Sequence, residues 1–373
     1  MRVGLITTLN TNIGDDFIRE GICSLLRHVF SKQVVTFVPI NKHRPLTVYP
    51  HRHPVQVAQL ARYLPRGRQH VFQLIERAAS GLRFSHFETC DLIVQCGTPV
   101  AWFGCWRCEW AEPLWHHVVG RLSNKGIPVL NLGAGACFPW EAQPERIENE
   151  NDALYLGRIL AYCRATTARD RLAKRLFEFL EHSCPLIPCP AFLAGKALTN
   201  GSADRDLVVI NYMEGGGHYD FGQSINPNAW RSTARNLIAS LRQNHRLLFV
   251  CHDQKEYAIA SALNGDIPRV LPKNSQEYFS IVARAKVGIC NRLHAAVAMA
   301  GIGIPSVSVG TDTRMLMVEA VGLPVFYVKD ATVGGVEDKL HCLLDNQESE
   351  RERLLSLRED TWKRYLEVVE NAL

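Results

Sequence analysis

The sequence predicts an α/β protein made of two Rossmann-like domains, whose parallel sheets face a central cleft. Short apolar runs alternate with amphipathic stretches along the chain, and this alternation occurs in two units of similar length. A proline-rich and then polar segment, residues 184–205, separates the two units. Strands that alternate with helices favour parallel sheets covered by helices on both faces. At 373 residues, the chain has room for two domains of about 100–200 residues each.

The first unit is expected to begin with a buried strand and an amphipathic helix. Asp15 and Asp16 follow Gly14 and suit a helix N-terminus, where carboxylates meet unpaired N–H groups. Residues 41–70 are rich in His, Arg and Pro and are expected to form a loop or insertion. Strands are expected at 2–8, 34–40, 91–96, 128–132 and 164–168, and helices at 14–29, 71–79, 151–163 and after Asp170.

The second unit repeats the pattern. Strands are expected at 207–210, 246–251, 270–271, 287–290 and 306–309, and helices at 228–243, 254–263, 275–285, 292–300, 312–321 and 351–372. We therefore place the domains at 1–195 and 196–373, and expect the last helix to pack back across the cleft. In such sheets ligands bind beyond the carboxyl ends of the strands, so residues at strand ends are the first candidates for a site.

Charge and composition exclude several classes of protein. Lys and Arg number 42 against 37 Asp and Glu, a net charge of +5 that is spread along the chain without a basic run. This argues against a nucleic-acid partner and fits an anionic small substrate. No apolar segment approaches the ~20 residues of a membrane span, and the N-terminus lacks the features of a signal peptide. We expect a cytoplasmic protein. Peripheral contact with the inner face of the membrane, through Arg62, Arg66 and Arg68, is a further hypothesis. The oligomeric state stays open.

The strongest candidate for chemistry is Asn291-Arg292-Leu293-His294, which follows the strand at 287–290. A helix N-terminus attracts anions, and an arginine fork binds a carboxylate or phosphate through two bonds. Histidine exchanges its proton near neutral pH. Arg292 and His294 therefore either hold an anionic donor and supply a proton, or form a helix-capping pair that only packs.

Residues 287–305, VGICNRLHAAVAMAGIGIP, resemble the signature of the polysaccharide pyruvyl transferase family. That signature is a strand, then Arg-Leu-His-Ala, a helix of small residues and Gly-x-Pro. Further pieces resemble the family in the same order along the chain: 12–15, 91–97, 168–170 and 275–285. The resemblance covers most of residues 1–325.

The resemblance implies an enzyme that transfers pyruvyl from phosphoenolpyruvate to a sugar of a cell-surface polysaccharide or its precursor, forming a ketal. It implies two Rossmann-like domains similar to the GT-B glycosyltransferase architecture, with the acceptor on the N-terminal side, the donor on the C-terminal side and no cofactor. Arg292 and His294 match the donor-site pair of the family, and Arg169 matches a second donor-site arginine. On this basis an imidazolium at His294 would protonate the methylene carbon, and Arg292 would stabilise the leaving phosphate.

Other residues at strand ends and in glycine-rich turns are candidates for substrate binding. A base must take the sugar proton, and the candidates for that role are Asp15, Asp16, Glu214 and His218. Glycine-rich turns let the backbone approach a ligand closely. The remaining candidates are Gly97, Thr98, Gly215, Gly216 and His252. The family often has a run of glycines where this chain reads Gly97-Thr98-Pro99, which leaves the acceptor open.

The segment 99–115 holds four of the seven tryptophans. Trp102, Trp106 and Trp110 are spaced by four residues, so we expect one helix face. Such a face would stack on sugar rings or form part of the core. Cys105 and Cys108 are a lone C-x-x-C without a second pair, so no metal site is expected, and nothing around them resembles a redox motif.

Two alternatives stay open beside the pyruvyl transferase. A GT-B-type glycosyltransferase with a nucleotide-sugar donor would use Arg292 and His294 on a diphosphate. A non-catalytic sugar-binding homologue would keep the fold without turnover, and the altered loop at 97–99 is the feature that suggests it.

Overall fold

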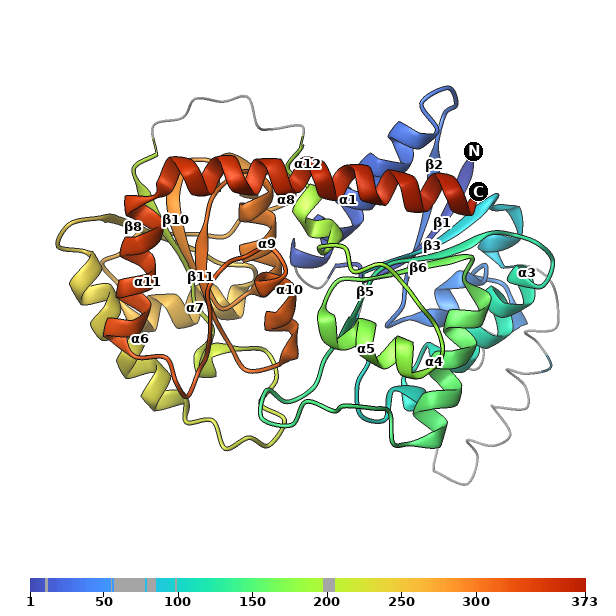
Figure 1. Cartoon of the computed structure of the whole chain (residues 1–373), viewed down its shortest axis with the longest axis horizontal. Coiled ribbons are helices and arrows are strands. Elements are labelled where there is room, and N and C mark those ends of the chain that lie inside the picture. The colour runs from blue at the N-terminus through green and yellow to red at the C-terminus, as the bar shows by residue number, and fades with distance from the viewer. Residues whose placement is uncertain (11–12, 55, 57–77, 79–84, 98, 197–204) are drawn as a thin grey trace.

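The computed structural model describes residues 1–10, 13–54, 56, 78, 85–97, 99–196 and 205–373. It places two α/β halves side by side, each with its own sheet (Figure 1). Every strand pairing in the described part of both sheets is parallel. The predicted fold class is therefore confirmed.

In the first half the sheet has the order β2-β1-β3-β5-β4, and β6 pairs with β5. Its strands are β1 (Arg2–Thr7), β2 (Thr36–Asn41), β3 (Leu92–Cys96), β4 (Pro99–Ala101), β5 (Val129–Ala136) and β6 (Ala165–Ala168). Its helices are α1 (Ile13–Val29), α3 (Arg121–Ser123), α4 (Glu150–Tyr162) and α5 (Arg171–Phe179). A π-helix covers Ala111–Gly120. The helix expected at 71–79 lies outside the described residues, apart from residue 78.

In the second half the order is β12-β11-β10-β7-β8-β9. Its strands are β7 (Leu207–Asn211), β8 (Arg246–Val250), β9 (Arg269–Val270), β10 (Ala285–Cys290), β11 (Ser306–Gly310) and β12 (Val325–Tyr327). Its helices are α6 (Pro227–Leu241), α7 (Gln254–Leu263), α8 (Ser275–Val282), α9 (Leu293–Gly301), α10 (Leu316–Glu319), α11 (Val333–Asp345) and α12 (Gln347–Ala372). The division at 195/196 stays a prediction, and it adjoins residues 197–204, which lie outside the described part.

An apolar interface joins the halves. Phe17 of α1 packs against Tyr278 and Phe279 of α8, with ring centroids 4.7 and 5.3 Å away. The turn at Pro190–Leu193 is wedged between α1 and α9, and a Cβ at Gly21 or Gly301 would lie 2.0 or 2.2 Å from its carbonyl oxygens. The small residues of α9 therefore let the chain of the first half approach this helix closely.

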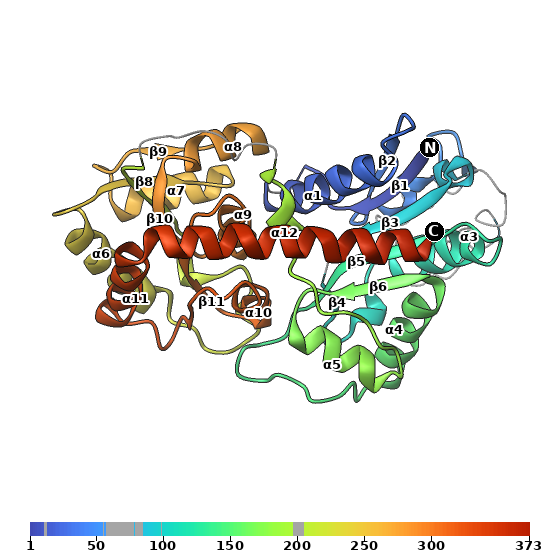
Figure 2. The same ribbon diagram turned by 45° about the horizontal axis from the view of Figure 1, so that its top comes forward.

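Helix α12 runs along both halves, from α11 to the neighbourhood of the first sheet (Figures 1 and 2). Arg358 donates to the Gly301 carbonyl (2.9 Å) and Tyr365 donates to the Pro188 carbonyl (3.0 Å). These bonds fix the helix to α9 on one side and to the connecting segment on the other.

The tryptophan segment does not form the expected helix. It consists of β4, a 3-10 turn at Cys105–Arg107 and the π-helix. Gly104 lies in the left-handed region at φ 76°, and Pro113 falls within the segment. Both features interrupt an α-helix, so the regular spacing of the tryptophans was misleading here.

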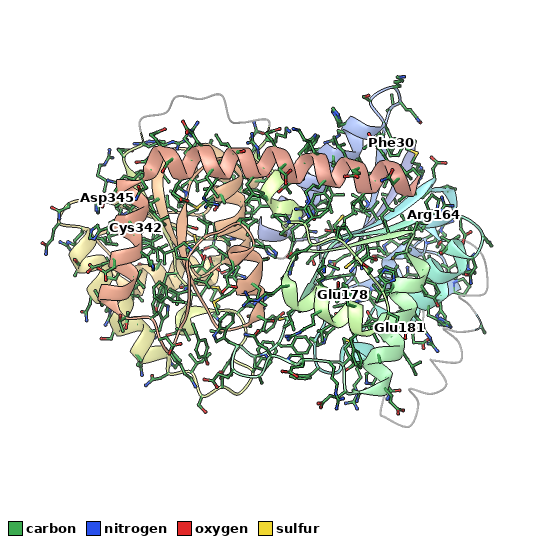
Figure 3. All side chains as sticks on the ribbon, viewed as in Figure 1. Phe30, Arg164, Glu178, Glu181, Cys342 and Asp345 are labelled. Carbon is green, nitrogen blue, oxygen red and sulfur yellow. The ribbon has the colours of Figure 1, made fainter. Side chains whose placement is uncertain are left out.

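The twelve cysteines are free thiols, and ten of them are buried. Cys342 is exposed on α11, at the outer edge of the second half (Figure 3). The thiols therefore serve mainly as small apolar side chains of the core.

Candidate active site

A cavity of about 590 Å³ lies between the two halves. Its volume is within the range of small-molecule sites, about 300–1,000 Å³. Much of its lining lies within two residues of the ends of strands in both sheets: Thr8 after β1, Lys42 after β2, Cys137 after β5, Met213 after β7, His252 after β8, Asn291 after β10 and Thr311 after β11. The cavity thus lies at the carboxyl ends of both parallel sheets, as expected for this fold class.

Arg292 enters this cavity already paired with two carboxylates. It is the N-cap residue of α9. Its Nε donates to Glu256 (2.5 Å) and its Nη2 donates to Asp253 (3.0 Å). Its backbone N–H donates to Asn211 (2.7 Å). The guanidinium is therefore held in one orientation, with part of its charge offset before any ligand binds.

Glu256 is the centre of a buried polar network. Its carboxylate also accepts the His252 N–H (2.7 Å) and the Asn211 side-chain amide (3.1 Å). Burial raises the pKa of Glu256, and Arg292 opposes this rise. Asn291 accepts the Met213 N–H (2.8 Å) and donates to the Val309 carbonyl. These bonds tie the ends of β7, β8, β10 and β11 together.

Arg169 and His294 meet across the two halves. Arg169 follows β6, and its Nη1 lies 3.2 Å from His294 Nε2. The arginine is fully buried, and its Nε and Nη2 have no hydrogen-bond partner within the described part of the chain. An arginine only donates, so Nε2 of His294 is the acceptor in this contact.

Burial lowers the pKa of His294 well below its ordinary value, and Arg169, Arg314 and Arg292 lower it further. These surroundings disfavour the imidazolium that was expected from the sequence. Three cations and a dehydrated ring favour the neutral imidazole. A protonated His294 requires an anion that offsets these charges.

Arg314 was missed by the sequence analysis. It follows β11, lines the cavity, and donates from Nε and Nη2 to Asp312 (2.8 and 2.7 Å). Its guanidinium carbon lies 4.7 Å from the ring centroid of Tyr219. The strand-end rule would have found it, because Thr311, Asp312 and Arg314 directly follow the strand predicted at 306–309.

Lys42 was also missed, since it was assigned to the irregular segment 41–70. It is buried, lines the cavity, and lies 4.9 Å from the ring centroid of Trp110. Burial lowers the pKa of Lys42 to about 8, while Asp15 opposes this effect. The membrane contact proposed for Arg62, Arg66 and Arg68 lies outside the described residues.

His252 lines the cavity as a neutral ring. It is 7% exposed, its ring packs edge-on against Phe17 and Tyr278, and burial lowers its pKa to about 3. Neither ring nitrogen has a hydrogen-bond partner among the described residues. Such a ring can both donate to and accept from a bound molecule.

The structure brings Asp15, His218, His252, Arg292 and His294 to the cavity, and Arg169 contacts His294 from behind. The other predicted binding residues do not line it. Asp16 pairs with Arg19 (2.6 Å), Glu214 pairs with Arg231, and Gly97, Gly215 and Gly216 lie outside the lining. Thr98 lies outside the described residues. The choice of a base thus narrows to Asp15 and His218.

The C-x-x-C thiols serve the packing of the tryptophan segment. Cys105 donates to Asp152 (3.2 Å). Burial raises the pKa of both thiols, that of Cys108 to about 11. In the described ranges, no three His, Cys, Asp or Glu side chains gather so as to hold a metal ion. No helix in those ranges is long and apolar enough to cross a bilayer.

A family model described as polysaccharide pyruvyl transferase matches residues 12–313, which include α1, the Arg169 strand end and the whole of α9. The chain belongs to the polysaccharide pyruvyl transferase family. It is accordingly a transferase, and the family implies a sugar or polysaccharide acceptor. No curated protein matches the chain.

Solved structures share the fold with this family member at low sequence identity. UDP-GlcNAc 2-epimerase from Neisseria meningitidis bound to UDP-GlcNAc has TM-score 0.54 and 9% identity, with 100% of each chain covered. A putative UDP-N-acetylglucosamine 2-epimerase from Listeria monocytogenes has TM-score 0.54 and 14% identity, over 95% of this chain and 90% of that one. UDP-GlcNAc 2-epimerase from Methanocaldococcus jannaschii has TM-score 0.50 and 15% identity, over 92% and 93%. These likenesses establish the GT-B-like arrangement of two halves.

Proposed function

We propose that this protein transfers the pyruvyl group of phosphoenolpyruvate to two hydroxyls of a sugar in a polysaccharide or its precursor, forming a ketal. The observation that carries the proposal is that Arg292 and Arg314 line the cavity together with His294, while Arg169 contacts His294 from behind. Phosphoenolpyruvate places a carboxylate and a phosphate on a three-carbon frame. Arginine forks bind both groups through paired hydrogen bonds.

The reaction needs a proton at the methylene carbon, because protonation makes C2 electrophilic. The anionic donor offsets the arginines around His294, so the ring can take up a proton once the donor is bound. It then transfers that proton to carbon. A sugar hydroxyl attacks C2 and loses its proton to a base, and Asp15 and His218 are the candidates at the cavity.

Inorganic phosphate then leaves C2 with the electron pair of the C–O bond, and the arginines stabilise its charge. The second hydroxyl then closes the ketal on the same carbon and gives its proton to the departing phosphate. One donor and one sugar diol thus give one ketal and one phosphate. No step calls for a redox or metal cofactor.

The competing interpretation is a glycosyltransferase with a nucleotide-sugar donor. The Neisseria epimerase that shares the fold holds UDP-GlcNAc, and the same arginines would suit a diphosphate. The two functions differ in the donor, so donor binding separates them. We place the donor on the side of residues 196–373 and the acceptor on the side of residues 1–195.

Calorimetric titration of phosphoenolpyruvate and of UDP-GlcNAc into the wild type and into Arg169→Met tests the proposal. We expect phosphoenolpyruvate alone to bind, and the substitution to weaken binding about a hundredfold, because a charged hydrogen-bond donor is removed from a buried site. Arg292→Ala is a less suitable test of donor binding, because it also leaves the carboxylates of Glu256 and Asp253 without their cationic partner.

The thermal midpoint of Arg169→Met is the control for folding. Removing a buried arginine that has two unpaired nitrogens should leave the midpoint unchanged or raise it. Binding of UDP-GlcNAc in place of phosphoenolpyruvate would assign the chain to the nucleotide-sugar class. Binding of neither donor would favour the non-catalytic homologue.

A further inference from the structure

The first half contributes two tryptophans to the cavity, together with the charged side chains of Asp15 and Lys42. Trp102 and Trp110 both line it, with ring centroids 5.7 Å apart and planes inclined by 57°. His43 packs edge-on against Trp110 at 5.1 Å. Asp15, from the first turn of α1, lines the same side. We call Trp102, Trp110 and Asp15 the acceptor wall.

The acceptor wall is held in place from behind by α4. Asp152 of this helix accepts the Gly104 N–H (2.9 Å), the Trp106 N–H (3.1 Å) and the Cys105 thiol (3.2 Å). One buried carboxylate thus fixes the turn between the two tryptophans. The rings stay in position without a ligand, which lowers the entropic cost of binding.

The composition of the wall matches one class of molecule. A hexopyranose presents a face of C–H groups that packs on an aromatic ring, and a rim of hydroxyls that needs acceptors and donors. Indole rings provide the apolar surface, and the Asp15 carboxylate accepts hydroxyl protons. A small anion such as the donor has no apolar face to place against the indole rings.

We propose that the acceptor wall binds a single hexopyranose unit by packing its C–H face on Trp102, which the largely buried Trp110 supports, with Asp15 accepting hydrogen bonds from the two hydroxyls that react. This rests on the proposed function for the reaction, whereas sugar binding is a separate property. The wall selects for a pyranose with an unhindered C–H face, and it leaves the donor residues of the second half free for phosphoenolpyruvate.

Saturation-transfer NMR tests the proposal directly, because it detects which protons of a bound sugar lie against the protein. The probes are the methyl glycosides of galactose, glucose, mannose and N-acetylglucosamine, with uridine as the competing stacking ligand. We expect at least one glycoside to receive saturation through its ring protons in the wild type. In Trp102→Ala that signal should weaken about tenfold, because an aromatic contact is removed.

Trp106→Ala is the matched control, since Trp106 lies in the same segment but is 37% exposed and does not line the cavity. It should keep the full signal. Trp110 is largely buried, so Trp110→Phe, which keeps an aromatic ring, replaces a truncation there. Thermal midpoints of all three variants identify any that fail to fold.

The outcomes separate this proposal from the proposed function. Loss of the glycoside signal in Trp102→Ala with unchanged phosphoenolpyruvate affinity supports the acceptor wall. Equal signals in Trp102→Ala and Trp106→Ala, no signal from any glycoside, or transfer to uridine alone overturns it. If phosphoenolpyruvate does not bind the wild type but the glycoside signal depends on Trp102, the donor assignment fails and the sugar wall stands.

Discussion

The wall that the second half contributes to the cavity contains a network of charged side chains, whereas the wall from the first half combines two tryptophans with the charges of Asp15 and Lys42. In the second half, Arg292 and Arg314 are each oriented by carboxylates. In the first half, Trp102 and Trp110 provide the surface. Fixed charges suit a small donor of constant shape, and a stacking surface suits one face of a larger acceptor.

The two walls also differ in how the chain builds them. The charged wall comes from residues just past the ends of β7, β8, β10 and β11, so the parallel sheet itself places them. The tryptophans of the acceptor wall come from an irregular segment, whose turn at residues 104–106 is held by a single buried carboxylate, Asp152. Consequently, loss of one member of the charged network should lower the stability of the protein strongly. Substitution of a side chain on the surface of the tryptophan segment should lower it little.

The largest effect is expected at Glu256, which joins Arg292, His252 and Asn211. Glu256→Ala leaves the guanidinium of Arg292 with Asp253 alone and removes two further acceptor contacts. Breaking a buried pair on one side costs about 3–5 kcal/mol. Urea unfolding should report a loss of this size, together with loss of phosphoenolpyruvate binding.

Glu214→Ala is the matched control in the same half, because Glu214 pairs with Arg231 at the surface and lies outside the cavity lining. An exposed pair contributes about 1 kcal/mol or less. Similar losses in the two variants would mean that the network around Arg292 is not a special feature of the charged wall.

A second prediction concerns pH, through His252. Its pKa is about 3 in the folded chain because of burial first and Arg292 second, against about 6.5 for an unperturbed histidine. Below about pH 6.5 the unfolded chain takes up a proton that the folded chain does not, so the free energy of unfolding falls as the pH falls. Between pH 7 and pH 5 this one residue should account for about 2 kcal/mol.

His252→Phe should flatten that dependence, since Phe fits beside Phe17 and Tyr278 and does not titrate. His86→Gln, at an exposed position, should leave it unchanged. Urea midpoints at the two pH values measure the effect. An equally steep pH dependence in wild type and His252→Phe would show that the buried ring does not contribute to the instability of the charged wall in acid.

Particular residues show how far the sequence could predict this arrangement. The strand-helix alternation and the strand-end rule were enough for the fold class and for the placing of His252, Arg292 and His294 at one cavity. Arg314 follows the same rule, just after the end of β11, but lies outside the signature at 287–305. These successes share a cause: in a parallel sheet, sequence position at a strand end fixes position in space.

The remaining features depend on contacts between distant segments. Glu256 lies on α7 and, from the sequence, is one of several charged residues of an amphipathic helix, so its bond with Arg292 has no local signal. The lowered pKa of His294 arises first from burial and then from Arg169 and Arg314, which are brought near it only by the fold. The tryptophan spacing indicated a helix, and the left-handed Gly104 overrode it.

The smallest effect is expected for Arg314→Lys, which tests whether the two walls of the cavity act separately. Arg314 binds Asp312 through two bonds, 2.8 and 2.7 Å long, and its guanidinium carbon lies 4.7 Å from the ring centroid of Tyr219. A lysine keeps the charge but loses the planar fork, so the group is no longer fixed in direction. If Arg314 binds one anionic group of the donor, the affinity for phosphoenolpyruvate should fall about tenfold, equivalent to about 1.4 kcal/mol. The affinity for a methyl glycoside at the acceptor wall should not change. Calorimetry with both ligands measures the two values on one sample. An equal loss for both ligands would mean that Arg314 shapes the whole cavity and that its two walls do not act separately.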